Sequence, residues 1–333
     1  MPKQPKPIID WLSFTLPYGG DAGNSSFDWI IETFGAMSKP MKKGFRGYAN
    51  AAVLDNRGLV GWTPARPENR IHVMLSSRAL WGWQPASLVL IRDIIRIGGT
   101  FSRIDLAFDD LTGLLSMDEI RGCCLSGAVA TRFRSWSSID GYAVENDKDI
   151  HVEMIESGDF KGNVGRTIYI GRRISESFIR VYDKRAEVIA KHPDADPPPH
   201  WIRFEIETKK DRADRLAGAL VDGHNPVGYA RSLIDFKKPQ PGDTRRDRWP
   251  LADWWLSFMG GHEKAPLVVP EGNPDWFEDM LSWLETQCSA AVYVAGELGY
   301  LDEILEKGKR RAAKKQRYLQ VLKKTPLREI KVL

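Results

Sequence analysis

The stretch RIDLAFDD, residues 103–110, alternates charged and apolar side chains with a period of two. Successive side chains of a β-strand project to opposite faces of a sheet, so Arg103, Asp105 and Asp109 share one face and the apolar residues share the other. Asp110 faces the apolar side if the strand is regular. The stretch therefore predicts a strand with one buried face and one charged face.

The stretch WIRFEIET, residues 201–208, has the same period and places Arg203, Glu205 and Glu207 on one face. If two such strands are neighbours their carboxylates converge, and aligned negative charges repel unless a cation lies between them. A hard divalent cation with oxygen ligands is the usual solution. The candidate metal ligands are, in this order, Glu205, Asp105 and Asp109, with Glu207 a weaker addition. The alternative is a solvated polar face on which Arg103 and Arg203 pair with neighbouring acids.

The stretch FIRVYDK, residues 178–184, places Tyr182 among cations at the end of an expected strand. A phenol beside cations is expected to lose its proton more easily, which would make Tyr182 a nucleophile, and Arg180 and Lys184 would then hold a phosphate. Two further arginines are expected to orient the carboxylates or to contact a DNA backbone, namely Arg103 and Arg203. The alternative is that Tyr182 is a half-buried strand residue, because aromatic side chains are common in strands for packing reasons.

Four motifs follow one another along the chain: IDWLSFT (9–15), RIDLAFDD (103–110), TIYIGRRISESFIRVYDKRAE (167–187) and WIRFEIE (201–207). In this order and spacing they resemble the replication initiation factor family, Rep_trans, and the resemblance covers about residues 8–235. The family contains rolling-circle initiators of plasmids and filamentous phages, and relatives that act as relaxases of conjugative elements.

The resemblance implies a metal-dependent DNA nickase that initiates rolling-circle replication. Tyr182 matches the tyrosine of the family's R-[IV]-Y-[ND]-K motif, which cuts origin DNA and stays on the 5′ phosphate until strands are rejoined. Acids of RIDLAFDD and RFEIE would bind the divalent metal, Mg²⁺ or Mn²⁺, and Asp10 in the first motif is a further candidate. The family uses carboxylates where most nickases use a His-hydrophobe-His triplet, and none of the six histidines lies in such a triplet.

The expected partner is origin DNA, duplex or hairpin, single-stranded at the nick site. A host helicase and a second copy of the chain are further expected partners. Three alternatives stay open: a relaxase that nicks a conjugative transfer origin, a catalytically inactive sequence-specific DNA-binding regulator, and a metal phosphoesterase that uses water and forms no covalent adduct.

The order of expected strands and helices predicts an α+β fold. Two similar halves with antiparallel sheets and packed helices would surround a central cleft, and each half would end in an acidic strand followed by an amphipathic helix. Residues 1–236 would form this duplicated catalytic domain, 237–250 a basic Pro/Gly-rich linker, and 251–333 a C-terminal helical, basic DNA-binding region.

Two basic clusters are expected to contact the DNA backbone, because neutralising phosphates releases counterions. The linker contributes Lys237, Lys238, Arg245 and Arg246. The C-terminal region contributes Lys309, Arg310, Arg311, Lys314 and Lys315. For the second cluster, the alternative is a solvated basic helix.

Composition limits the class of protein. The 333 residues are 42% hydrophobic, which is enough for a core without disulfides, and the net charge of +4 is mild for a DNA enzyme. Three cysteines form no plausible disulfide framework, and neither a signal peptide nor a membrane-spanning run is apparent. We expect a cytoplasmic protein that does not contact membranes.

Overall fold

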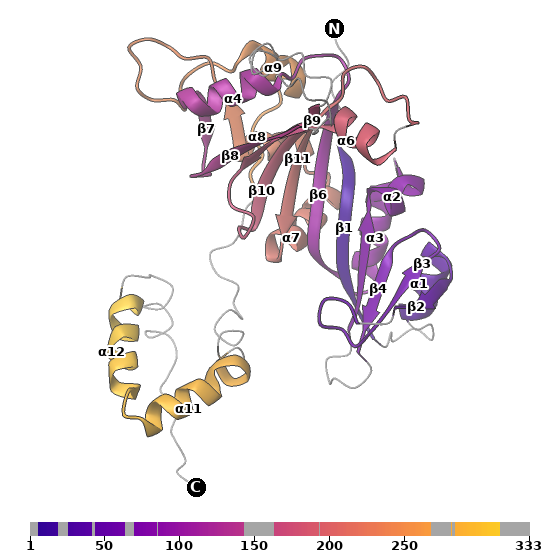
Figure 1. The fold of residues 1–333 in the computed structure, drawn as a ribbon, viewed down its shortest axis with the longest axis vertical. Helices are drawn as coiled ribbons and strands as arrows, with labels where there is room; N and C mark the ends of the chain where they lie inside the picture. The colour runs from indigo at the N-terminus through magenta and orange to yellow at the C-terminus, as the bar shows by residue number, and fades with distance from the viewer. Residues whose placement is uncertain are drawn as a thin grey trace, which may run out of the picture. The chain divides into compact units, whose positions relative to one another are not determined.

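The computed structural model describes residues 6–18, 26–41, 44–63, 70–84, 86–142, 163–192, 194–267, 281 and 284–313. Its largest element is a sheet of ten strands in the order β2-β3-β4-β5-β1-β6-β11-β10-β9-β8, in which neighbours are antiparallel. Figure 1 shows β6 and β11 side by side in the middle of this sheet. The expected α+β class with antiparallel strands is confirmed, and the two halves share one continuous sheet.

The first half of the sheet is formed by β1 (Ile8–Pro17), β2 (Met37–Pro40), β3 (Asn50–Leu54), β4 (Leu59–Trp62), β5 (Arg70–Ser76) and β6 (Thr100–Asp110). Its helices are α1 (Ser26–Phe34), α2 (Ser77–Leu80), the 3-10 helix η1 (Trp81–Trp83), α3 (Ser87–Arg96) and α4 (Met117–Ser126).

The second half of the sheet is formed by β8 (Trp136–Tyr142), β9 (Asn163–Ile170), β10 (Ser177–Asp183) and β11 (Ile202–Lys209). Its helices are α6 (Lys184–Lys191), α7 (Asp211–Val221), α8 (Pro226–Leu233) and α9 (Asp253–Met259). A separate pair of short strands consists of β7 (Val129–Thr131) and β12 (Ile234–Phe236).

The two central strands have one apolar face and one charged face. Leu106 and Phe108 of β6 face the core together with Phe204 and Ile206 of β11, and each is at most 1% exposed. Helix α7 packs against both strands. Burying a side chain of this size contributes about 1.5–3 kcal/mol, so this face fixes the register of the strands. The charged residues consequently lie on the opposite face of the sheet.

Helix α9 belongs to the same compact unit as the sheet, and this unit extends to Leu267. Trp255 of α9 is fully buried, with its ring 5.0 Å from that of Phe236. Asp235 accepts hydrogen bonds from the Trp255 indole at 3.0 Å and from Arg231 at 3.1 Å. Helix α9 therefore helps to complete the core of the first unit.

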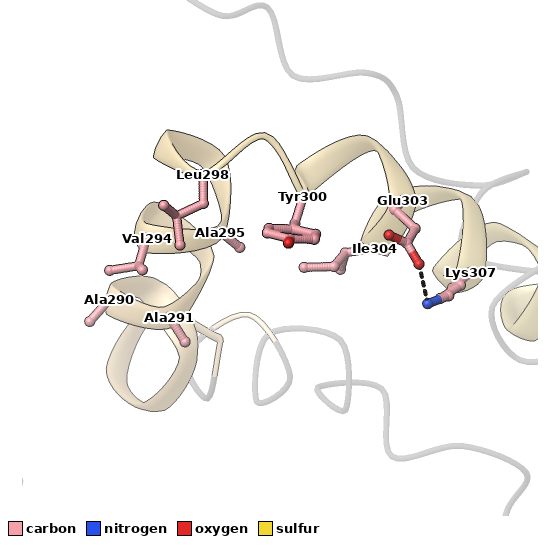
Figure 2. A pocket seen from close by; sticks show the side chains of 9 residues that line it. All are labelled: Ala290, Ala291, Val294, Ala295, Leu298, Tyr300, Glu303, Ile304 and Lys307. Atoms are coloured by element: carbon pink, nitrogen blue, oxygen red, sulfur yellow. Dashed lines mark hydrogen bonds and ion pairs between the residues drawn. The ribbon is translucent and has the colours of Figure 1, made fainter.

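The second unit spans Val268–Leu333, and its described helices are the π-helix η2 (Leu284–Cys288), α11 (Ser289–Glu297) and α12 (Leu301–Ala312). A hollow of about 740 Å³ lies between α11 and α12. Figure 2 shows apolar side chains of both helices lining it, with an ion pair between Glu303 and Lys307 at the end formed by α12. No helix in the described part of the chain is long and apolar enough to cross a membrane.

Candidate active site at the centre of the sheet

The pairing of β10, β11 and β6 gathers the charged residues of three strands into one patch. Glu205 of β11 lies opposite Arg180 on one side and Ala107 on the other. Two residues earlier, Arg203 lies opposite Tyr182 and Asp109. Neighbouring strands are about 4.8 Å apart, so the side chains of these positions are within reach of one another.

The hydroxyl of Tyr182 is hydrogen-bonded to an acid. Its hydroxyl donates to Glu205 Oε2 at 3.0 Å, and the Glu205 side chain is 1% exposed. Burial, and after it the negative charge of Glu205, raise the pKa of the Tyr182 phenol well above its ordinary value. The expectation that nearby cations ease its deprotonation is therefore wrong for this arrangement. The same contact supplies an adjacent acceptor for the proton.

Arg103 donates two hydrogen bonds to Asp105, from Nε to Oδ1 at 2.9 Å and from Nη2 to Oδ2 at 2.6 Å. Arg103 also lies 2.7 Å from Glu207, which in turn lies 2.9 Å from Lys209. Burial raises the pKa of Asp105 to about 8, with the charges of Glu205 and Glu207 acting in the same direction and Arg103 acting against them. Asp105 is thus a buried acid whose pKa stays raised although Arg103 compensates part of its charge.

Arg203 joins the two remaining acids of the patch. Its guanidinium donates to both oxygens of Asp109, at 2.6 and 2.7 Å, and also to Asp10. The pairing of β1 with β6 shifts register between Ile9 and Trp11, so Asp10 is the extra residue of a bulge. Bulges redirect side chains beside functional sites, and here the bulge brings Asp10 to the patch.

Lys184 lies next to Tyr182 and is engaged by a residue of its own helix. Asp183 caps α6 by accepting a hydrogen bond from the backbone of Ala186 at 2.8 Å. The Lys184 ammonium lies 2.8 Å from Glu187 and 5.6 Å from the centre of the Tyr182 ring. It is therefore close to the nucleophile predicted from the sequence and is turned toward a carboxylate.

The predicted metal ligands form a buried acidic group without a preformed cage. Among the residues that the structure describes, no three His, Cys, Asp or Glu side chains converge in a way that would hold a metal ion. The donor chemistry nevertheless fits a hard divalent cation, because Asp105 and Glu205 are both 1% exposed and share one cationic neighbour, Arg180. Asp109 is turned to Arg203, and Glu207 to Arg103 and Lys209.

Asp110 lies on the other face of β6, as the strand period predicts. Its carboxylate accepts hydrogen bonds from the backbone of Thr112 at 2.9 Å and of Leu115 at 2.7 Å, and lies 2.9 Å from His200 Nε2. Its role is to fix the loop that follows β6.

The predicted DNA-contacting residues lie in different surroundings. Lys237 is buried, and its ammonium donates to the carbonyl oxygen of Trp249 at 2.9 Å, so it is not available to a phosphate. Lys238, Arg245 and Arg246 are exposed. Lys309, Arg310 and Arg311 are exposed on α12, whereas Lys314 and Lys315 lie outside the described residues.

The sequence pattern does not identify every residue of the patch. Glu187 holds Lys184, and Trp11 lies against Arg103, whose guanidinium carbon is 4.6 Å from the centre of the indole ring. The helical spacing of three between Lys184 and Glu187 is a visible signal. The contact of Trp11 depends on the pairing of β1 with β6, which has no local signature.

Known proteins share both the sequence pattern and the fold of this chain. The replication initiation factor family matches residues 99–312. The chain is 25% identical over 282 residues to NicK of Bacillus subtilis (strain 168), described as a candidate DNA relaxase, and the match covers 79% of this chain and 74% of NicK. Its fold is similar to that of a rolling circle replication initiator protein from Geobacillus stearothermophilus, with a TM-score of 0.60 and 22% identity over 79% of this chain and 98% of that one. Because the family match covers more than half of its residues, the chain belongs to the replication initiation factor family.

Proposed function

We propose that the protein initiates rolling-circle replication by nicking one strand of origin DNA with Tyr182. The observation that supports this most strongly is the 3.0 Å hydrogen bond from the Tyr182 hydroxyl to Glu205, inside a buried charged patch. A phenol bonded to a carboxylate has a proton acceptor in place, and Arg180 beside it can bind a phosphate. Membership of the family and the similarity to a DNA relaxase support the same activity.

In the proposed reaction, the Tyr182 oxygen attacks the phosphorus of one phosphodiester, and its proton passes to Glu205. The bond from phosphorus to the 3′ oxygen breaks, and the 3′ oxygen leaves as a hydroxyl after taking the proton from Glu205. The 5′ phosphate stays on Tyr182 as a phosphotyrosine. Attack by the 3′ hydroxyl reverses these steps and rejoins the strands, because one phosphoester bond replaces another.

Positive charge at the phosphate comes from the side chains around Tyr182. Arg180 and Lys184 are proposed to hold the phosphoryl oxygens, and Arg103 and Arg203 to keep the acids in place. Mg²⁺ or Mn²⁺, which the family resemblance implies, would be held by Asp105 and Glu205 with Asp109 as the third predicted ligand, and would neutralise charge on the phosphoryl group.

DNA affinity is proposed to come from exposed cations away from the patch. Lys238, Arg245 and Arg246 follow β12, and Lys309, Arg310 and Arg311 lie on α12. These residues would contact phosphates of the duplex, as the sequence predicts, while Lys237 has a structural role.

Trapping the covalent intermediate tests the proposed function. The wild-type chain is incubated with Mn²⁺ and an oligonucleotide that spans the origin nick site, and the product is separated under denaturing conditions and digested for mass spectrometry. We expect a DNA adduct on Tyr182, none with Tyr182→Phe, and unchanged duplex binding by that variant. An adduct on another residue such as Tyr169 would move the nucleophile, and cleavage without any adduct would favour a water-using phosphoesterase.

A second function, nicking of a conjugative transfer origin, is favoured by the similarity to NicK, which is described as a candidate DNA relaxase. The chemistry would be the same and the DNA sequence different. Supercoiled plasmids that contain either a replication origin or a transfer origin from the same element separate the two functions by which plasmid is nicked.

A further inference from the structure

Arg180 occupies the space between two buried carboxylates. Its terminal nitrogen Nη2 contacts Glu205 Oε1 and lies 3.7 Å from Asp105 Oδ2. Both carboxylates are 1% exposed, whereas the Arg180 side chain is 24% exposed. Two buried carboxylates can both be ionised only with a positive charge close by, and Arg180 is a cation that these two acids share.

Arg180 is held less completely than the other arginines of the patch. Arg103 makes two hydrogen bonds to Asp105 and lies against Trp11, and Arg203 makes two to Asp109 and one to Asp10. The buried Nε of Arg180, in contrast, has no hydrogen-bond partner among the residues that the structure describes. Moving Arg180 away therefore breaks fewer hydrogen bonds than moving either of the other two.

The two oxygens of Glu205 face different partners. Oε2 accepts the hydrogen bond of Tyr182, and Oε1 contacts Arg180. A cation that takes the place of Arg180 can thus bind Oε1 and leave the hydrogen bond with Tyr182 intact.

We propose that Arg180 is a resident counter-ion that exchanges with the divalent metal. The guanidinium and the metal occupy the space between Asp105 and Glu205 alternately. Two cations held in this space at the same time would repel each other strongly, because charges interact more strongly inside a protein than in water. Guanidinium groups bind phosphate with two parallel hydrogen bonds, so a phosphate of the bound strand draws Arg180 out of this space. DNA and metal then strengthen each other's binding, and this last step rests on the proposed function.

Calorimetric titration of the full chain with Mn²⁺ alone tests the exchange. Arg180→Gln removes the charge and keeps a hydrogen-bonding group for Glu205, so we expect it to bind Mn²⁺ at least about tenfold more tightly than the wild type. The matched control is Lys209→Gln, which removes the same charge beside Glu207 but not from between Asp105 and Glu205, and we expect less than about a threefold change. Equal Mn²⁺ affinity in Arg180→Gln and wild type, or an equal gain in Lys209→Gln, would overturn the proposal.

A second measurement has as its main comparison a chain that retains Arg180, so that comparison does not depend on the folding of the first variant. Mn²⁺ affinity is measured for Tyr182→Phe with and without a single-stranded oligonucleotide. We expect the oligonucleotide to raise the Mn²⁺ affinity of Tyr182→Phe about tenfold. In the double variant that also carries Arg180→Gln, the oligonucleotide should raise the Mn²⁺ affinity by less than about threefold. No change in Tyr182→Phe would overturn the coupling. Failure of the wild type to form the tyrosine adduct, with these affinities as expected, would overturn the proposed function and leave the exchange standing.

Discussion

The charges at the centre of the sheet and the charges on α12 lie in opposite environments. Asp105 and Glu205 are 1% exposed and are held by arginines. On α12, Lys309 is 78% exposed and lies 3.6 Å from Glu306 of the same helix. A buried charge is costly to leave without its partner, whereas an exposed pair contributes about 0–1 kcal/mol. Substitutions in the patch should therefore change chemistry or stability strongly, and those on α12 should change affinity for DNA gradually.

The largest effect is expected when Glu205 loses its ability to accept the Tyr182 proton. Glu205→Gln keeps the shape of the side chain but removes its basicity, so we expect nicking to slow by about 10²–10⁴-fold. The measurement is the single-turnover rate of adduct formation on a short oligonucleotide. A matched control is Glu187→Gln, which removes an acid that contacts Lys184 and not the phenol. An equal loss of nicking rate in both variants would mean that the loss comes from removing a negative charge near the site and not from removing the proton acceptor.

Two adjacent lysines, one buried and one exposed, allow the same contrast between buried and exposed charges to be measured as a difference in folding stability. Lys237→Ala removes a buried side chain and leaves the carbonyl of Trp249, in a partly buried hydrogen bond, without its donor; it should lower the free energy of unfolding by about 1–3 kcal/mol. Lys238 is 61% exposed and paired with Asp253. Lys238→Ala should change the free energy of unfolding by less than about 0.5 kcal/mol. Urea unfolding of both variants checks this, and similar midpoints would contradict the buried role of Lys237.

The pH dependence of stability tests the electrostatics of Asp105. Its pKa in the folded chain, about 8, lies above its ordinary value of 3.8, so the folded state binds more protons than the unfolded state between these values. Stability of the metal-free chain should therefore fall as pH rises through this window, and the fall should end above about pH 8. In Asp105→Asn, the fall in the free energy of unfolding over this window should be smaller by at least about 1.4 kcal/mol, the equivalent of one pKa unit. Parallel unfolding curves for both chains between pH 5 and pH 8 would contradict the assignment.

The smallest effect is expected on α12. Replacing Lys309, Arg310 and Arg311 by glutamine should weaken duplex binding and make the slope of log K against log salt shallower by about 0.9 for each phosphate that the variant no longer neutralises. Adduct formation on a short single-stranded oligonucleotide should persist, because that substrate needs only the patch. Circular dichroism establishes that the variant is folded, and an unchanged salt slope in a folded variant would leave α12 as a solvated basic helix.

Period-two alternation predicts the central strands well. β6 and β11 occur where RIDLAFDD and WIRFEIET place them, and Asp110 lies on the side that the alternation assigns to it. The pattern is informative because a half-buried strand must separate apolar and charged residues. The convergence of both acidic strands with Tyr182 on one face follows from the same alternation once the strands are paired.

Contacts that depend on packing are not visible in the sequence. The bulge at Asp10, the position of Trp11 and the inward direction of Lys237 all result from pairing between distant segments. A lysine in a Pro/Gly-rich basic stretch is usually exposed, and only the fold of the segment around Trp249 shows that Lys237 is not. The proximity of Tyr182 to cations is visible along the chain, but its nearer contact with Glu205 comes from the neighbouring strand.

The ion pair between Asp10 and Arg203 also has a consequence for protein synthesis. The two residues are 193 positions apart, Asp10 on β1 and Arg203 on β11. Contacts of such long sequence separation form late and slowly during folding. A nascent chain that has not yet released β11 has neither Glu205 nor Arg203, so we expect that such a chain cannot cut DNA.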